Sequence, residues 1–165
     1  QFAMAQRGNS MSVAMFDIDR FKVYNDTHGH AAGDDALRAF GDVLRQHTRA
    51  ADLAGRYGGE EFLTMLPRES IEGARIYAER VREALASREL PTGQRITVSA
   101  GLATSGPTMA TAADLIQAAD AALYMAKAAG GNRVEPIAIR PSDVSDPARL
   151  RDPAEAEKPA TAEGS

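Results

Sequence analysis

Residues 12–19 read SVAMFDID, an apolar run that ends in two aspartates. An unbroken apolar run of this length is typical of a strand that is covered on both faces of its sheet. We therefore expect a buried strand from Ser12 to Ile18, with Asp17 and Asp19 at its carboxyl end. Because a carboxylate is costly to place beside an apolar core, these two aspartates are the first candidates for a functional site.

Residues 56–66 read RYGGEEFLTML and predict a β-hairpin. The pair Gly58-Gly59 is a two-residue turn signal, and the residues from Phe62 to Leu66 are typical of the strand that returns from such a turn. Glu60 and Glu61 would then open the returning strand. If that strand lies beside the first one, its two glutamates converge with the two aspartates.

Apolar residues at helical spacing predict three helices, over residues 35–47, 74–85 and 112–128. The acidic start of the first helix suits the helix dipole, and Gly130-Gly131 is expected to end the third. Two more strands are expected, from Ile96 to Leu102 and from Val134 to Ile139. This order of elements predicts an α+β layered fold, in which helices flank a ferredoxin-like sheet.

The composition is that of a soluble globular protein with one core, because 44% of the 165 residues are hydrophobic and 25% are charged. The apolar runs fall far short of the roughly 20 residues needed to cross a bilayer, so we expect no membrane contact from this segment. A net charge of −4 disfavours a non-specific nucleic-acid binder, which needs a cationic surplus. The absence of cysteine excludes disulfides and thiolate metal ligands and is compatible with a cytoplasmic location.

The composition changes after Arg140, where proline, alanine and acidic residues replace apolar ones. Such a segment has too little apolar surface to bury to offset the entropy of ordering it. We therefore expect a folded domain over residues 1–140 and a disordered tail over residues 141–165.

Four carboxylates at one edge of a sheet would repel one another unless protons or cations relieved the repulsion. Oxygen ligands without cysteine indicate Mg²⁺ or Mn²⁺. Magnesium held by one or two carboxylates usually takes phosphate oxygens as further ligands, which indicates a nucleotide substrate. Each of these acids taken alone is more often an exposed strand-end or turn residue, so the hypothesis depends on their combination.

The longer pattern resembles the GGDEF family of diguanylate cyclases in its GGEEF form. The matching segments are FDIDRFKVYND (residues 16–26), Gly29-His30, Gly33-Asp34 and RYGGEEF (residues 56–62). The resemblance extends from about Ser12 to Val134. It implies a sheet like that of nucleotide cyclases and polymerase palm domains, and an enzyme that condenses two GTP molecules into cyclic di-GMP with release of pyrophosphate.

The resemblance also implies a metal site and a catalytic base. Asp17, Glu60 and the main-chain carbonyl of Ile18 would bind Mg²⁺ or Mn²⁺. Glu61 or Glu60 would accept the proton of the attacking 3′-hydroxyl, and the sequence does not choose between them. Because each domain would carry one nucleotide site, two domains must face each other across a two-fold axis, so the active form is expected to be a homodimer.

The same resemblance assigns the contacts with GTP. Asn25 and Asp34 would bind guanine, because an amide and a carboxylate suit the edge of guanine that carries N1–H and the exocyclic amine. Lys22 and Lys127 would neutralise the triphosphate, and main-chain amides near Phe21 would bind its end.

A regulatory site is implied by Arg49-Ala50-Ala51-Asp52, which matches the RxxD inhibitory motif of the family. An arginine and an aspartate can grip the two edges of a guanine base, and Arg80 matches a further arginine of that site. The product, cyclic di-GMP, would bind there and inhibit its own synthesis. Without the resemblance, an exposed Arg–Asp pair would be expected to contribute almost nothing.

Two departures from the family pattern stand out. Gly131 occupies the position where an arginine is usual, so one phosphate contact is expected to be lost. The family's Asp-x-Leu-Thr turn is absent before the first strand. We expect a sensor or dimerisation region upstream, through which a longer protein could be tethered to a membrane.

Two other classes of function compete with a cyclase. A non-catalytic receptor for cyclic di-GMP would retain only a product site, but the undamaged GGEEF hairpin favours catalysis. A polymerase-like palm acting on nucleic acid fits the paired carboxylates, yet the chain lacks a basic channel.

Overall fold

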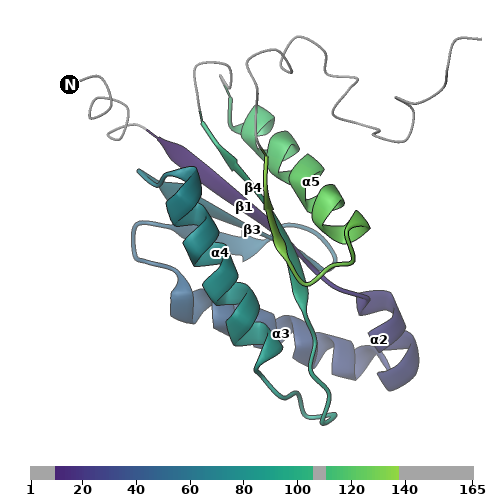
Figure 1. Cartoon of the computed structure of the whole chain (residues 1–165). Coiled ribbons are helices and arrows are strands. Elements are labelled where there is room, and N and C mark those ends of the chain that lie inside the picture. The colour runs from purple at the N-terminus through teal and green to yellow at the C-terminus, as the bar shows by residue number, and fades with distance from the viewer. Residues whose placement is uncertain (1–9, 106–110, 138–165) are drawn as a thin grey trace, which may run out of the picture.

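The computed structural model describes residues 10–105 and 111–137, which form one sheet with helices on both faces (Figure 1). The elements follow the order β1 (Met11–Ile18), α2 (Phe21–His28), α3 (His30–His47), β2 (Leu53–Arg56), β3 (Glu61–Pro67), α4 (Ile71–Ala86), β4 (Val98–Thr104), α5 (Ala112–Ala128) and β5 (Val134–Pro136). The five strands are ordered β2-β3-β1-β4-β5. β1 is antiparallel to both β3 and β4, whereas β5 runs parallel to β4.

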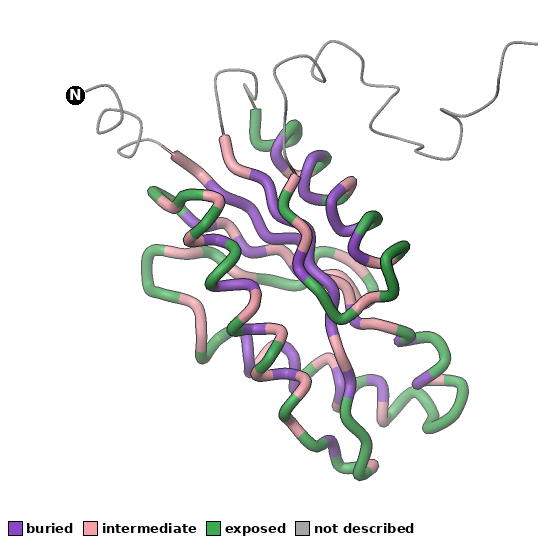
Figure 2. Tube along the Cα trace, in the orientation of Figure 1, coloured by how far each residue is buried: buried purple, intermediate pink, exposed green. Residues whose placement is uncertain are grey.

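The prediction of a helix-flanked α+β sheet is confirmed. β1 is the central strand, and because successive side chains of a strand point to opposite faces, it contributes to two cores. Phe16 and Ile18 pack with α3 and α4 on one face, while Val13 and Met15 pack with α5 on the other. Figure 2 shows that the buried residues concentrate along these central strands and on the helix faces that turn toward them.

Helix α5 lies unusually close to the sheet because Gly101 of β4 has no side chain. A Cβ at Gly101 would lie 2.0 Å from the main-chain oxygen of Ala119 and 2.1 Å from the main-chain nitrogen of Leu123. Any larger residue would therefore push α5 away from β4. Gly101 lies opposite Met15 of β1 in the strand register, so α5 packs closely over the centre of the sheet.

Several predicted boundaries were wrong. α3 begins at His30 rather than Asp35, so its first turn carries no acid. The short helix α2 was not predicted, because it buries only Phe21 and Tyr24. β4 begins at Val98, although Ile96 before it is buried.

The hairpin turn is longer than the two residues expected from Gly58-Gly59. Both Tyr57 and Gly58 donate from their main-chain nitrogens to the carbonyl of Glu61, at 2.8 and 3.2 Å. Arg56 therefore pairs with Phe62, and Glu60 belongs to the turn rather than to β3.

β5 ends at Pro136, although the main-chain nitrogen of Ile137 still donates to Leu102 at 2.8 Å. Ile139 and the tail expected over residues 141–165 lie outside the described residues. Within the part of the chain that is described, no helix combines the length and the hydrophobicity that crossing a bilayer requires.

Candidate active site

The carboxyl end of β1 brings the predicted carboxylates together. In the strand register Asp17 lies opposite Glu61 of β3 and Ser99 of β4. The main-chain nitrogen of Ile18 also donates to the carbonyl of Glu60, at 3.3 Å. The GGEEF turn is thus attached directly to the end of β1, as required if both are to act on one ligand.

Lys127, near the end of α5, reaches this cluster from the face of the sheet that α5 covers. Its ammonium group donates to a carboxylate oxygen of Asp17 and to the main-chain oxygen of Ile18, the latter at 3.2 Å. It also lies 3.2 Å from a carboxylate oxygen of Asp19. All these side chains are partly shielded from solvent, with Lys127 31% exposed and Asp17 19% exposed.

Asp19 differs from Asp17 because three neutral donors form hydrogen bonds with its carboxylate. Its carboxylate accepts hydrogen bonds from the hydroxyls of Thr97 and Ser99, each at 2.7 Å, and from the main-chain nitrogen of Asn132 at 2.8 Å. Burial raises the pKa of Asp19, but these hydrogen bonds together with Lys127 outweigh it, so the net pKa is lowered. Asp19 therefore stays ionised and ties β1, β4 and the turn after α5 together.

The pKa values of the other three carboxyl groups, of Asp17, Glu60 and Glu61, are raised. Burial raises the pKa of Asp17, although its contact with Lys127 opposes the rise. Burial also raises the pKa of Glu60 and of Glu61, and the negative charge of Asp17 raises both further. A raised pKa means that the site disfavours its own ionised acids. A cation bound here would be stabilised by them.

A divalent metal is compatible with these residues, but a bound phosphate and water would have to supply the remaining metal ligands. Within residues 10–105 and 111–137, no three acidic or histidine side chains form a ready-made metal cage. Magnesium needs only one or two carboxylates when phosphate oxygens and water supply the remaining ligands. Asp17, Glu60 and the carbonyl of Ile18 match that requirement. The positively charged ammonium group of Lys127 contacts two of them, Asp17 and the carbonyl of Ile18.

Asn25 forms the second part of the site. Its side-chain oxygen is buried and has no hydrogen-bond partner among the described residues. The oxygen lies directly against α3, where a Cβ at Gly33 would be only 1.8 Å away, so only glycine is compatible with this arrangement. Asp34 follows on the exposed face of α3. A buried acceptor without a protein partner can accept a hydrogen bond from a bound molecule.

Phe21 and Lys22 begin α2, between the carboxylates and Asn25. Phe21 is buried and anchors the helix start, whereas Lys22 is exposed. The preceding Arg20 has a left-handed conformation with φ of 53°, and no described side chain caps the helix. The first amides of α2 are therefore available to an anion.

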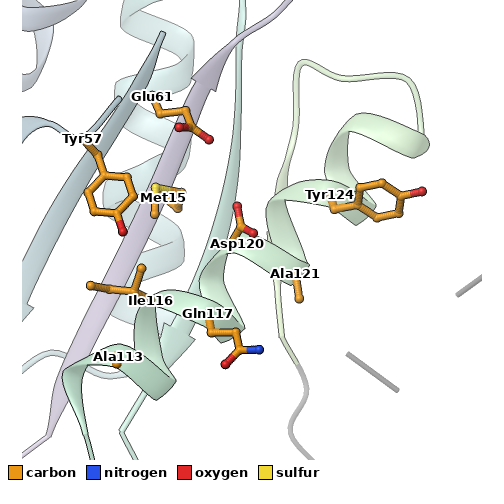
Figure 3. A pocket seen from close by; sticks show the side chains of 9 residues that line it. All are labelled: Met15, Tyr57, Glu61, Ala113, Ile116, Gln117, Asp120, Ala121 and Tyr124. Atoms are coloured by element: carbon orange, nitrogen blue, oxygen red, sulfur yellow. The ribbon is translucent and has the colours of Figure 1, made fainter. Parts of the chain in front are cut away.

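A cavity of about 630 Å³ opens beside Glu61, between the hairpin and α5 (Figure 3). It is lined by Met15, Tyr57, Glu61, Ala113, Ile116, Gln117, Asp120, Ala121 and Tyr124. In Figure 3 the carboxylates of Glu61 and Asp120 point toward the same end of the cavity. Asp120 was not predicted as a site residue, but its spacing of seven residues from Lys127 places both on one helix face.

The RxxD residues lie in the turn between α3 and β2, away from the carboxylate cluster. Asp52 accepts a hydrogen bond from the main-chain nitrogen of Arg49 at 2.9 Å, so the two residues are close but do not form an ion pair through their side chains. The guanidinium of Arg49 instead lies 3.3 Å from Glu69. Arg80 is exposed on α4, one turn after Tyr77, whose hydroxyl lies 3.0 Å from that of Thr48.

Gly131 lies against Asp19 with φ of 74°, a conformation that side-chain-bearing residues rarely adopt. A Cβ there would lie 3.0 Å from the nearest carboxylate oxygen of Asp19. The glycine therefore fits its local structure, and an arginine at this position would be strained.

Comparison with known proteins identifies the family of the chain. The family model described as "Diguanylate cyclase, GGDEF domain" matches residues 1–133. Diguanylate cyclase A of Treponema denticola is 40% identical over 132 residues, which are 78% of this chain and 36% of that protein. Diguanylate cyclase DgcP of Pseudomonas aeruginosa is 42% identical over 131 residues, or 78% of this chain and 19% of that protein. The chain thus spans 36% of the length of the first relative and 19% of the length of the second.

Solved structures agree with this relationship. The active GGEEF domain of a diguanylate cyclase from Vibrio cholerae superimposes with a TM-score of 0.77 at 32% identity, covering 84% of this chain and 90% of that one. The GGDEF domain of DgcB from Caulobacter crescentus, in complex with cyclic di-GMP, superimposes with a TM-score of 0.74 at 36% identity, covering 82% of this chain and 84% of that one.

Proposed function

Because the chain belongs to the GGDEF-domain family of diguanylate cyclases, we propose that it condenses two molecules of GTP into cyclic di-GMP and releases pyrophosphate. One observation carries the proposal. The acids of the GGEEF turn and the end of β1 share one edge of the sheet with the ammonium group of Lys127, next to a helix start with uncapped amides. This combination of charges suits a metal-bound triphosphate.

Asp17, Glu60 and the carbonyl of Ile18 would hold Mg²⁺ or Mn²⁺. The metal would stabilise charge on the reacting phosphate and lower the pKa of the attacking hydroxyl. The raised pKa values of Asp17 and Glu60, caused mainly by burial, support this role, since a bound cation would stabilise their partly desolvated ionised forms.

Guanine would bind between α2 and α3. The unpartnered oxygen of Asn25 would accept a hydrogen bond from the base, and Asp34 would accept from N1–H and the exocyclic amine. Adenine lacks this pair of donors, so the two residues would select GTP over ATP. Lys22 and the amides near Phe21 would bind the terminal phosphates, with Lys127 as a further positive charge.

In the chemical step, the 3′-hydroxyl of one GTP attacks the α-phosphate of the other, and pyrophosphate leaves. We assign the proton acceptor to Glu61, because Glu60 would be occupied with the metal and Glu61 faces the open cavity. A carboxyl group with a raised pKa is a stronger base than an ordinary one. A second attack in the opposite sense closes the ring.

Two domains are needed, because one domain offers a single nucleotide site. Facing domains across a two-fold axis would each supply one GTP. Cyclic di-GMP would in turn bind Arg49, Asp52 and Arg80 and hold the domains where the two GTP sites cannot meet. The exposed guanidinium groups of both arginines support this second site. Inhibition requires that the product bind the unproductive arrangement more tightly than the productive one.

Two conservative variants test the assignment of the metal site. Asp17→Asn and Glu60→Gln each remove one negative charge with little change in shape, so both should abolish synthesis of cyclic di-GMP from GTP and Mg²⁺. Circular dichroism should show an intact fold. Full activity in either variant contradicts the assignment, whereas binding of cyclic di-GMP without any synthesis in the wild type would favour a receptor.

A further inference from the structure

We propose that Lys127 is an internal counter-cation: it occupies the metal position of the nucleotide-free domain and thereby makes metal binding depend on nucleotide. The inference rests on the proposed function for the identity of its ligands. It adds a role that phosphate binding by Lys127 does not include, since it concerns the state before any ligand arrives.

The contacts of the ammonium group carry the proposal. Lys127 donates to Asp17 and, at 3.2 Å, to the carbonyl of Ile18. These are two of the three groups that would bind the metal. A lysine ammonium and a divalent ion repel each other strongly at contact distance in a partly buried site. Metal bound by Asp17 and Ile18 therefore requires Lys127 to leave them.

The surroundings explain why Lys127 rests there. Asp17 is 19% exposed and makes no ion pair with any other basic side chain in the described structure. The close packing of α5 on Gly101 fixes the helix that carries Lys127. The ammonium group thus compensates an acid that would otherwise be partly buried without a partner, a situation that is strongly destabilising.

Asp19 offers Lys127 an alternative ion-pair partner. Its carboxylate lies 3.2 Å from the ammonium group and is held in position by Thr97, Ser99 and Asn132. Lys127 can therefore release Asp17 and Ile18 and still keep an acidic neighbour. An incoming triphosphate adds the attraction that favours this move.

The consequence is positive coupling between the two ligands. Metal alone must displace Lys127 and leave it only Asp19 as a partner, whereas metal with nucleotide also offers the ammonium group new phosphate oxygens. Nucleotide should therefore tighten metal binding, and metal should tighten nucleotide binding by the same factor. Removing the lysine charge should strengthen binding of metal alone and reduce the coupling.

The test measures Mn²⁺ binding from the electron paramagnetic resonance signal of the free ion, with and without α,β-methylene GTP, which cannot release pyrophosphate. Without nucleotide, Lys127→Met should bind Mn²⁺ about tenfold more tightly than the wild type, within the range of roughly 5- to 150-fold that is typical of coupled sites. The factor by which the analogue tightens Mn²⁺ binding should fall by a similar amount. Arg68→Met is the matched control, because Arg68 is exposed, forms no ion pair among the described residues and follows Pro67, which pairs with Met11 at the end of β1 opposite to Asp17, so Mn²⁺ binding without nucleotide should not change.

A thermal melt gives a second readout. Without metal, Lys127→Met should melt at a lower temperature than the wild type, and Mn²⁺ should raise its melting temperature more than that of Arg68→Met. If Lys127→Met does not fold, Lys127→Gln keeps a donor for Ile18 without the charge and takes its place.

Each outcome is decisive. Unchanged or weaker Mn²⁺ binding by the nucleotide-free, folded variant overturns the counter-cation role while leaving the proposed function intact. Absence of Mn²⁺ binding by the wild type, even with the analogue, contradicts both the proposed function and the coupling.

Discussion

Replacing Asn25 with alanine is expected to change stability and substrate affinity in opposite directions. The side-chain oxygen of Asn25 is buried without a partner among the described residues, and such an unsatisfied acceptor costs roughly 1–3 kcal/mol. Alanine is also the better helix former, by up to about 0.7 kcal/mol. The free energy of unfolding of the nucleotide-free domain should therefore rise by about 1–3 kcal/mol, as measured by urea denaturation.

GTP binding should weaken in the same variant. The base would lose one hydrogen-bonding partner in a buried setting, which is worth roughly 1–3 kcal/mol, or about 5- to 150-fold in affinity. ATP binding should change little, because adenine lacks the pair of donors that Asn25 and Asp34 would recognise on guanine. Calorimetric titration with the α,β-methylene analogues of GTP and ATP in the presence of Mg²⁺ measures both affinities.

Asp26→Ala is the matched control, since Asp26 is an exposed neighbour on the same helix. It should gain helix propensity without relieving a buried acceptor, and its affinity for GTP should stay near that of the wild type. If Asn25→Ala proves less stable than the wild type, or loses GTP and ATP affinity equally, Asn25 serves the fold rather than the base.

Three further predictions follow from the site. Gly131→Arg should lower the melting temperature below that of the wild type and should not tighten GTP binding, because φ of 74° and the contact with Asp19 strain any side chain there. Tighter GTP binding without loss of stability would contradict this prediction. The pKa of Asp19 is lowered in the folded state, so its contribution to stability is present above its unfolded pKa of about 3.8 and is lost as the pH falls through the lower folded value. Urea denaturation between pH 2 and pH 7 should therefore show a weaker acid dependence in Asp19→Asn, and an unchanged profile would refute the role of those hydrogen bonds. Arg49→Ala should weaken inhibition by cyclic di-GMP, while Glu69→Gln, which frees the Arg49 guanidinium, should strengthen it. Calorimetry measures the binding of cyclic di-GMP and initial rates measure the inhibition; if neither variant changes them, the assignment of this site is wrong.

Continuous apolar runs made the central part of the fold predictable. The residues from Ser12 to Ile18 form β1 almost as expected, because a strand covered on both faces leaves an unmistakable pattern. The start of α3 was not predictable in this way, since residues 30–34 read HAAGD and lack a large apolar side chain. Tertiary packing of Gly33 against Asn25 explains why this stretch carries no large side chain.

The contacts of the candidate site were less accessible to sequence reasoning because they join distant segments. Lys127 and Asp17 are 110 residues apart, and Asp19 meets Thr97, Ser99 and Asn132 from two other segments. Neither periodicity nor spacing reports such pairs. The family resemblance suggested that Lys127 meets phosphate, but its contact with the acids emerges only from the packing of α5 on β4.

The chemistry itself is tested most directly by the products formed from GTP. Purified protein with GTP and Mg²⁺ should release two pyrophosphates for each cyclic di-GMP, as resolved by chromatography and a coupled pyrophosphate assay. The rate per protein should rise with protein concentration, because two domains must meet. ATP should yield neither product. Pyrophosphate without cyclic dinucleotide, or no turnover at concentrations where the protein is dimeric, would contradict the proposed diguanylate cyclase activity.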